Sequence, residues 1–129
     1  MFKKKEHIKE KKFTNIPNIL VISFQRIDFN NNTKNDCYIE FEENLNLDEF
    51  INKECYEGDK SVYNLTAIVN HFGTIQTGHY YCYIKLYKTN LWYEFNDDKF
   101  NLIGEKILNK GNAYSLFYNK KIILYNYIL

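Results

Sequence analysis

The residues best suited to chemistry lie in one stretch, Tyr63 to Asp98. His79 follows Gly78 at the start of an apolar-rich run, and Asn96–Asp98 closes the next run. In an antiparallel hairpin, the start of one strand and the end of the next lie at the same end of the sheet. Histidine suits proton transfer near neutral pH. A histidine base and an orienting partner are two members of a catalytic triad, so the third member to find is a nucleophile.

The neighbours of His79 favour a cysteine as that nucleophile. Asn96 is placed to accept the imidazole Nδ1–H, which would leave Nε2 facing the nucleophile. An amide partner suits a cysteine, because a thiolate can form beside an imidazolium without a charged orienting residue. Asp97 adds a negative charge that favours the protonated imidazole. The alternative is a strand-end histidine that binds a backbone carbonyl, and residue spacing alone leaves both interpretations open.

None of the three cysteines, Cys37, Cys55 and Cys82, is an evident nucleophile. Cys82 lies three positions from His79 in one predicted strand, so their side chains leave on opposite faces. The other two have no helix start or glycine-rich turn beside them. His71, His79 and Cys82 match no zinc spacing, so we expect no metal and no cofactor. We expect His71 to be structural and to hydrogen-bond the backbone of the link that follows it.

Composition limits the class of protein. The 129 residues are enough for one compact domain, and 12 tyrosines, 10 phenylalanines and one proline favour strands. The net charge of +1 gives no field for nucleic acid or an acidic membrane, so we expect neither as a partner. Unpaired cysteines, no apolar leader and no apolar run long enough for a bilayer favour an intracellular protein, in the cytoplasm and/or the nucleus.

Apolar patterning predicts the strands that position these residues. We expect strands over 18–29, 37–41, 63–72, 80–88, 91–95 and 113–118, and one helical turn over 105–108. The run Asn18–Phe29 is apolar on both parities, which is typical of a central strand covered on both faces. Within Tyr63–Phe72, alternation places Leu65, Ala67 and Val69 on one face. The apolar set from 45 to 51 fits a helical turn or an edge strand.

In order along the chain, these segments resemble the C-terminal half of the catalytic domain of ubiquitin-specific proteases, the papain-like cysteine deubiquitinases. The similar motifs are Pro17–Ile22 with Gln25-Arg26, Lys34 with the run to Phe41, Tyr63–Leu65, Val69–Gly73, Gly78–Tyr81, Trp92–Asp97 and Ala113–Tyr118. The resemblance implies an α+β fold that is predominantly antiparallel β, the palm lobe of a papain-like cysteine peptidase without its helical thumb. It divides the chain into a charged lead-in (1–15), the palm part (16–120) and an apolar tail (121–129).

By position, the resemblance also implies roles for individual residues. His79 would be the general base, Asn96 the orienting residue and Asp97 an accessory acidic residue. Gly78 and Tyr80 would line the channel for the C-terminal Gly-Gly tail of ubiquitin. Three further residues would be structural near the site: His71, Gly73 and Trp92.

The implied activity is that of a ubiquitin carboxyl-terminal hydrolase, which cleaves an isopeptide or peptide bond after that tail through a cysteine thioester. In the family the nucleophile lies in the thumb, so we expect this chain alone to be inactive. The implied partners are ubiquitin or a ubiquitinated protein and a missing N-terminal thumb half. The alternative is a catalytically inactive half-domain that binds ubiquitin or serves as a scaffold. Without the thumb, the sheet face carrying Tyr80 or that carrying Tyr81 should expose an apolar patch and promote association.

Overall fold

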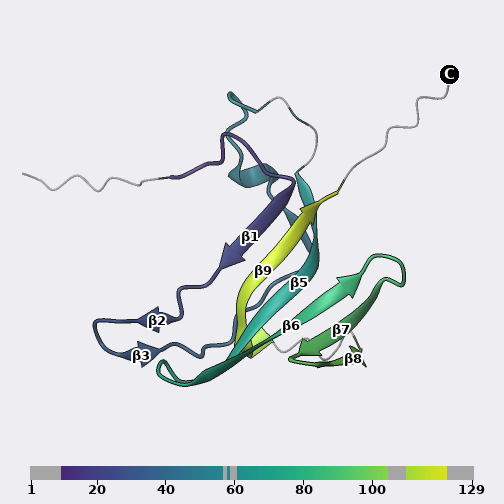
Figure 1. The fold of residues 1–129 in the computed structure, drawn as a ribbon. Helices are drawn as coiled ribbons and strands as arrows, with labels where there is room; N and C mark the ends of the chain where they lie inside the picture. The colour runs from purple at the N-terminus through teal and green to yellow at the C-terminus, as the bar shows by residue number, and fades with distance from the viewer. Residues whose placement is uncertain (1–9, 57, 59–60, 105–109, 122–129) are drawn as a thin grey trace, which may run out of the picture.

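The computed structural model describes residues 10–56, 58, 61–104 and 110–121. Within these ranges, seven strands form one antiparallel sheet in the order β1-β9-β5-β6-β7-β8, with β4 also paired to β5 (Figure 1). The strands are β1 (Ile19–Ser23), β4 (Asn44–Asn46), β5 (Val62–Gly73), β6 (Gly78–Leu86), β7 (Leu91–Asn96), β8 (Lys99–Ile103) and β9 (Ala113–Lys120). This confirms the predicted, predominantly antiparallel fold.

Smaller elements surround this sheet. A separate hairpin consists of β2 (Ile27–Asp28) and β3 (Thr33–Lys34). The described residues also include the short 3₁₀ helices η1 (Asp48–Phe50) and η3 (Lys110–Asn112). Before β1, Phe13 forms a bridge with Ile51, which fixes the chain to the segment after η1.

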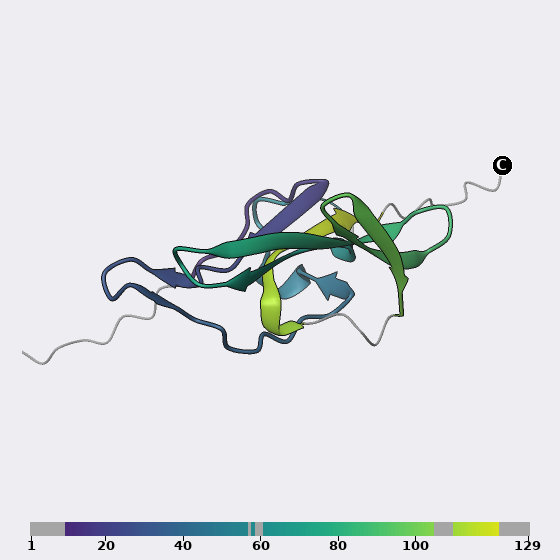
Figure 2. The same ribbon diagram turned by 60° about the horizontal axis from the view of Figure 1, so that its bottom comes forward.

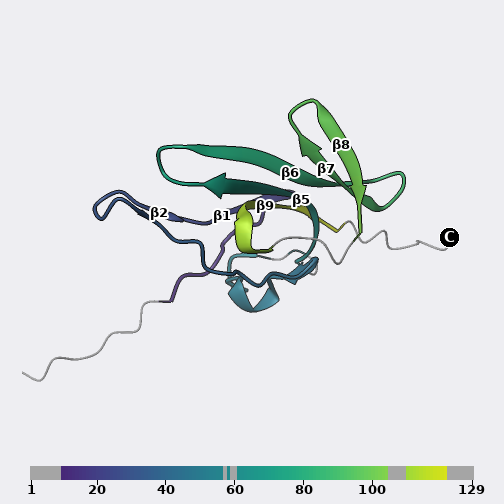
Figure 3. The ribbon, with the colours of Figure 1, turned by 90° about the horizontal axis from the view of Figure 1, so that it is seen from below.

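The core lies on one face of the sheet, on the side of η1, which Figure 3 shows below the sheet. The buried hydrophobic side chains are Ile16, Leu47, Ile51, Tyr63, Leu65, Ile68, Tyr83, Trp92, Ala113, Leu116 and Tyr118. The hydroxyl groups of two buried tyrosines donate hydrogen bonds to backbone carbonyls. Tyr63 donates to the carbonyl of Pro17 at 2.5 Å, and Tyr118 donates to that of Glu42 at 2.7 Å. The core can therefore hold tyrosines, because their polar ends reach the backbone.

Two predicted strands differ from the structure. The run 18–29 does not form a central strand, because β1 is short, lies at the sheet edge and is alternately exposed. Its outward side chains, Ile19 and Val21, are large and apolar, which made an edge strand look like a central one. No strand forms over 37–41. Part of that backbone is instead bound by a side chain, since Arg26 Nη1 donates to the carbonyl of Cys37 at 3.0 Å.

The burial pattern of β5 also departs from simple alternation. Its register against β9 shifts between Leu65 and Ala67, and again between Val69 and Asn70. A bulge moves the following residues to the other face of a strand. Ile68, rather than Ala67 or Val69, is therefore buried with Leu65.

The remaining predictions agree with the described residues. The turn between β6 and β7 contains Asn90 at φ 56°, a left-handed conformation that asparagine tolerates. The apolar set from 45 to 51 overlaps both of the structures that the sequence allows, the short strand β4 and the helical turn η1. The helical turn predicted over 105–108 lies outside the described residues.

Candidate active site

His79 and Asn96 meet at one end of the sheet, as the sequence predicts. His79 is the second residue of β6, and Asn96 is the last residue of β7. The imidazole Nε2 lies 2.6 Å from Oδ1 of Asn96. An amide oxygen can only accept a hydrogen bond, so Nε2 carries a proton and Nδ1 is unprotonated in the neutral ring. The side chain of His79 is 46% exposed, which places this pair at the surface.

This geometry corrects the expected choice of ring nitrogen. The sequence analysis assigned Nδ1 to Asn96, whereas the structure assigns Nε2. The β6–β7 ladder ends with Cys82 opposite Phe95, so its extension would put Tyr81 opposite Asn96. His79 is two residues farther along and must reach its partner diagonally. The far edge of the ring, which carries Nε2, therefore makes the contact.

Asp97 lies close to the same nitrogen but more loosely. Its Oδ2 is 3.8 Å from Nε2 of His79, and its side chain is 75% exposed. The residue occupies the turn after β7 at φ 53°, a left-handed conformation that aspartate tolerates. An exposed ion pair at this distance is weak and exists only when the imidazole is protonated. The position fits an accessory charge.

Tyr80 points away from His79, because successive residues of a strand face opposite sides. Its ring packs against His71 with centroids 4.5 Å apart, and edge-on against Tyr114 at 5.7 Å. Burial, the neighbouring Tyr114 and a hydrogen bond to it raise the pKa of Tyr80. A three-ring cluster thus lies behind the start of β6.

His71 does not form the side-chain hydrogen bond to the link backbone that the sequence predicts. It is buried, yet its Nδ1 has no hydrogen-bond partner in the structure. The ring instead packs against the backbone, since a Cβ built on Gly78 would overlap its Nε2. Burial, with the nearby Lys34 ammonium, lowers the pKa of His71, which favours the neutral ring. Its structural role therefore rests on shape rather than on hydrogen bonding.

Gly73 and Trp92, the other two residues expected to be structural, lie in different parts of the fold. Gly73 begins the link at φ 119°, where a side chain would be strained. Trp92 is buried in the core, with the Lys85 ammonium 5.8 Å from its ring centroid. Lys34 and Tyr114 stand in motifs of the resemblance, but the sequence predicts no role at the site for either. Lys34 binds the carbonyl of Gly73 at 2.8 Å, and neither residue has a periodicity that points to the site.

The three cysteines, Cys37, Cys55 and Cys82, lie in different surroundings. The register puts Cys82 opposite Val69 and Phe95, on the face away from His79, and burial raises the pKa of its thiol. Cys37 and Cys55 are exposed. Among the described residues, no hydrogen bond or ion pair joins a thiol to the imidazole. The same part of the chain contains no group of three or more His, Cys, Asp or Glu residues that could hold a metal ion.

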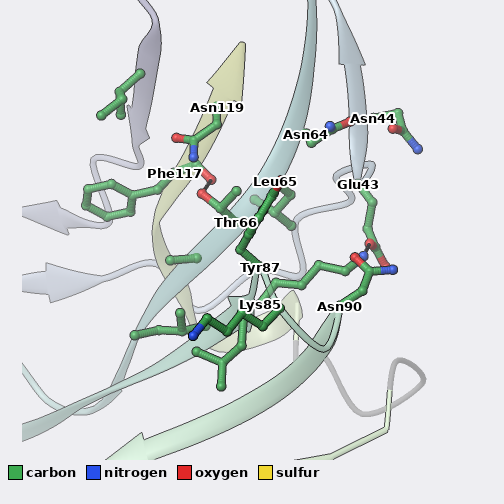
Figure 4. Close-up of a pocket in the computed structure, with 15 residues that line it drawn as sticks. Glu43, Asn44, Asn64, Leu65, Thr66, Lys85, Tyr87, Asn90, Phe117 and Asn119 are labelled. Atoms are coloured by element: carbon green, nitrogen blue, oxygen red, sulfur yellow. Dashed lines mark hydrogen bonds and ion pairs between the residues drawn. The ribbon is translucent and has the colours of Figure 1, made fainter. Parts of the chain in front are cut away.

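A groove of about 860 Å³ lies away from this site, across β1, β9, β5 and β6 (Figure 4). Its lining combines apolar side chains such as Leu65 and Phe117 with the ion pair between Lys85 and Glu43, whose atoms are 2.9 Å apart. His79 and Asn96 do not line it. The candidate active site lies elsewhere, at the end of the sheet, where the side chain of His79 is 46% exposed. No helix in the described ranges is long and apolar enough to cross a membrane.

Comparisons with known proteins identify the family of the chain. Residues 3–118 match the ubiquitin carboxyl-terminal hydrolase family. Ubiquitin carboxyl-terminal hydrolase 4 of Rattus norvegicus is 35% identical over 124 residues, which are 92% of this chain and 13% of the relative. Ubiquitin carboxyl-terminal hydrolase 10 of Arabidopsis thaliana is 32% identical over 108 residues, which are 81% and 12%. The chain spans a quarter or less of the length of the curated relatives it matches.

Solved structures show the same relationship. The SAGA Ubp8/Sgf11/Sus1/Sgf73 DUB module contains a chain that superposes with a TM-score of 0.74 at 30% identity, covering 87% of this chain and 25% of that one. The same module bound to ubiquitin aldehyde gives a TM-score of 0.72 at 30% identity, covering 84% and 25%. The chain therefore belongs to the ubiquitin carboxyl-terminal hydrolase family and corresponds to the C-terminal region of its domain.

Proposed function

We propose that this chain supplies the general base and the orienting residue of a cysteine-type deubiquitinase, which hydrolyses the bond after the C-terminal tail of ubiquitin. The observation that carries the proposal is the 2.6 Å contact between His79 Nε2 and Asn96 Oδ1. Family membership supports the reaction class. The similar module bound to ubiquitin aldehyde supports ubiquitin as the substrate.

In the proposed mechanism, Nδ1 of His79 takes the proton of the nucleophilic thiol. The thiolate then attacks the carbonyl carbon of the last glycine in the Gly-Gly tail. The imidazolium then protonates the departing amine, which leaves a thioester. Water attacks the thioester while Nδ1 accepts its proton, and the imidazolium returns that proton to the sulfur. Asn96 holds Nε2–H throughout, and the carboxylate of Asp97 lies 3.8 Å from the same nitrogen.

The nucleophile in this proposal comes from outside the chain. Cys82 lies on the other face of β6, and its burial disfavours the thiolate form. Gly78 and Tyr80 at the start of β6 are the residues that we propose to contact the ubiquitin tail, with the half-exposed Tyr80 ring on the face opposite His79. Three unpaired cysteines support a reducing compartment, so we place the protein in the cytoplasm or the nucleus.

The first test is the protonation pattern of the His79 ring. In a ring-nitrogen NMR spectrum of the full chain, recorded where the imidazole is neutral, we expect a protonated Nε2 and an unprotonated Nδ1. Asn96→Ala should mix the two tautomers, because the acceptor at Nε2 is lost. Asn101→Ala, which removes an exposed amide on β8, should leave the signals unchanged. A proton fixed on Nδ1 in the unmodified chain would contradict the proposed role.

The second test is activity in a complete domain. The chain would replace the matching segment of the rat relative, and cleavage of ubiquitin carrying a fluorogenic C-terminal amide would be measured. His79→Ala should lower kcat by roughly 100-fold or more, the usual contribution of a positioned general base. Asn101→Ala serves again as the control. Cleavage that survives His79→Ala would refute the catalytic assignment.

The absence of a thiol contact to His79 favours one alternative, a half-domain that binds ubiquitin without turnover. Titration of the labelled chain with ubiquitin distinguishes the two functions when it is combined with the chimaera. Binding by the chain together with an inactive chimaera supports the alternative. An active chimaera that needs His79 supports the enzyme.

A further inference from the structure

The backbone that presents His79 is paired with one neighbouring strand, whereas the middle of β6 is paired with two. The β6–β7 ladder ends at Cys82, whereas the β5–β6 ladder continues to Phe72 opposite His79 and Gly73 opposite Gly78. Within the described ladders, the first four residues of β6 therefore pair with β5 alone. Whatever fixes the end of β5 also fixes the backbone of His79.

Lys34 binds the end of β5 from outside the sheet. Its Nζ lies 2.8 Å from the carbonyl oxygen of Gly73, 3.5 Å from that of His71 and 2.7 Å from Oδ1 of Asp36. An ammonium has three N–H donors, so each has an acceptor here, although the contact to His71 is long. The side chain is only 7% exposed. A lysine this buried is costly unless it is paired, so its partners are specific.

The hairpin that carries Lys34 lies beside the link it binds. Figures 1 and 2 show β2 and β3 alongside the connection between β5 and β6. The two hairpins share no ladder, since β2 and β3 form a sheet of their own. A second, weaker contact joins their tips, where Gln76 Nε2 lies 3.4 Å from Asn32 Oδ1. Side chains, with Lys34 the best buried of them, therefore connect the hairpins.

The ring of His71 fills the space above the start of β6. It touches Gly78 so closely that a Cβ there would overlap Nε2. Tyr80 and Tyr114 pack against it with centroids 4.5 and 5.9 Å away. Its buried Nδ1 makes no hydrogen bond in the structure, so packing is what it contributes.

We propose that Lys34 and His71 are positioning residues for His79: the ammonium fixes the end of β5, and the imidazole ring fixes the start of β6 against it. This inference rests on the proposed function of His79 and adds two residues to its machinery. Neither residue touches the reacting groups, and both act through the backbone of the β5–β6 link.

The test compares Lys34→Met, which keeps a long side chain but loses the ammonium, with Lys88→Met, which removes an exposed lysine at the β6–β7 turn. The local readout is hydrogen exchange of the Thr74 amide, which donates to the Thr77 carbonyl at 2.7 Å and closes the link. The Asn90 amide, bonded to the Leu86 carbonyl at 2.8 Å, reports on the other end of β6. We expect Lys34→Met to speed exchange at Thr74 roughly tenfold or more, with Asn90 unchanged.

The ring spectrum of His79 separates positioning from general stability. We expect Lys34→Met to shift the His79 signals towards a mixture of tautomers, while Lys88→Met leaves them unchanged. Lys34→Arg should restore them, because a guanidinium can also donate to several acceptors. His71→Ala should resemble Lys34→Met, whereas His71→Phe should keep the wild-type signals because it retains a ring.

The outcomes distinguish this proposal from the proposed function. A wild-type spectrum without a protonated Nε2 counts against the role of His79 itself. A correct wild-type spectrum with unchanged His79 signals in Lys34→Met and His71→Ala overturns only the positioning proposal. Equal acceleration of exchange at Thr74 and Asn90 would also overturn it, because the effect would then be global.

Discussion

At the scale of single residues, the chemistry depends on which nitrogen of His79 is left unprotonated. The amide of Asn96 contacts Nε2, so the base that we propose is Nδ1, on the side of the ring nearer to the backbone. A base close to its own backbone depends strongly on the position of its strand. Small displacements of reacting groups are costly in catalysis, so the residues that pack behind β6 affect the site without touching it.

Gly78 provides a direct test of that packing. Gly78→Ala should destabilise the chain by about 1–3 kcal/mol, because the new methyl group would overlap the His71 ring. Gly104→Ala is the matched control, since its Cβ would meet nothing within 4 Å and should change stability by less than about 0.5 kcal/mol. Both values come from urea unfolding. If the two variants lose the same stability, the close approach of His71 is not what requires glycine.

At the scale of elements, the turn between β5 and β6 should be sensitive to acid. Burial, and then the charge of Lys34, lower the pKa of His71, while Asp36 opposes the shift. The unfolded chain therefore binds a proton on His71 more readily than the folded chain does. The contribution of the neutral His71 ring to the free energy of unfolding is fully present above about pH 6.5, the ordinary pKa of histidine. It is lost as the pH falls below that value.

Urea unfolding midpoints measured between pH 5 and 8 check this prediction. The wild-type midpoint should fall below pH 6.5, and His71→Phe should remove that part of the pH dependence. Lys34→Met should weaken it, because one cause of the lowered pKa is gone. A His71→Phe profile identical in shape to the wild type would assign the dependence to other groups.

The strands around the site could be predicted from sequence because they are long and joined by short turns. The turn after β6 and the acidic turn after β7 fix the pairing that brings His79 to Asn96. The ring nitrogen could not be predicted, because it depends on a two-residue offset along the ladder. Lys34 could not be found either, since it acts on β5 across 39 positions of sequence with no periodic signal.

The errors elsewhere have physical causes of the same kind. Apolar residues on both faces of β1 suggested a central strand, but an edge strand can carry Ile19 and Val21 on an open face. The bulges of β5 reverse its alternation, and bulges leave no clear mark in the residue pattern. The sequence therefore predicted where strands lie better than which of their faces is buried.

At the scale of the whole molecule, the two faces of the sheet differ. One face packs against β4 and η1, and the register assigns the Tyr80 side of β6 to the other face. Exposed apolar residues share that second face: Ile19, Val21, Leu86, Leu91, Phe100 and Leu102. Of the two faces that the sequence analysis considered, the structure therefore exposes the one carrying Tyr80.

An apolar face of this kind should make the isolated chain associate. We expect its mass in sedimentation equilibrium to rise with concentration. Phe100→Glu should shift the association to higher concentration, because Phe100 stacks on Phe95 at 6.0 Å and is 65% exposed. Phe29→Glu is the matched control, since Phe29 is also exposed but follows β2, away from the sheet. A single mass of 15.6 kDa at all concentrations, or an equal effect of the two variants, would show that this face does not drive association.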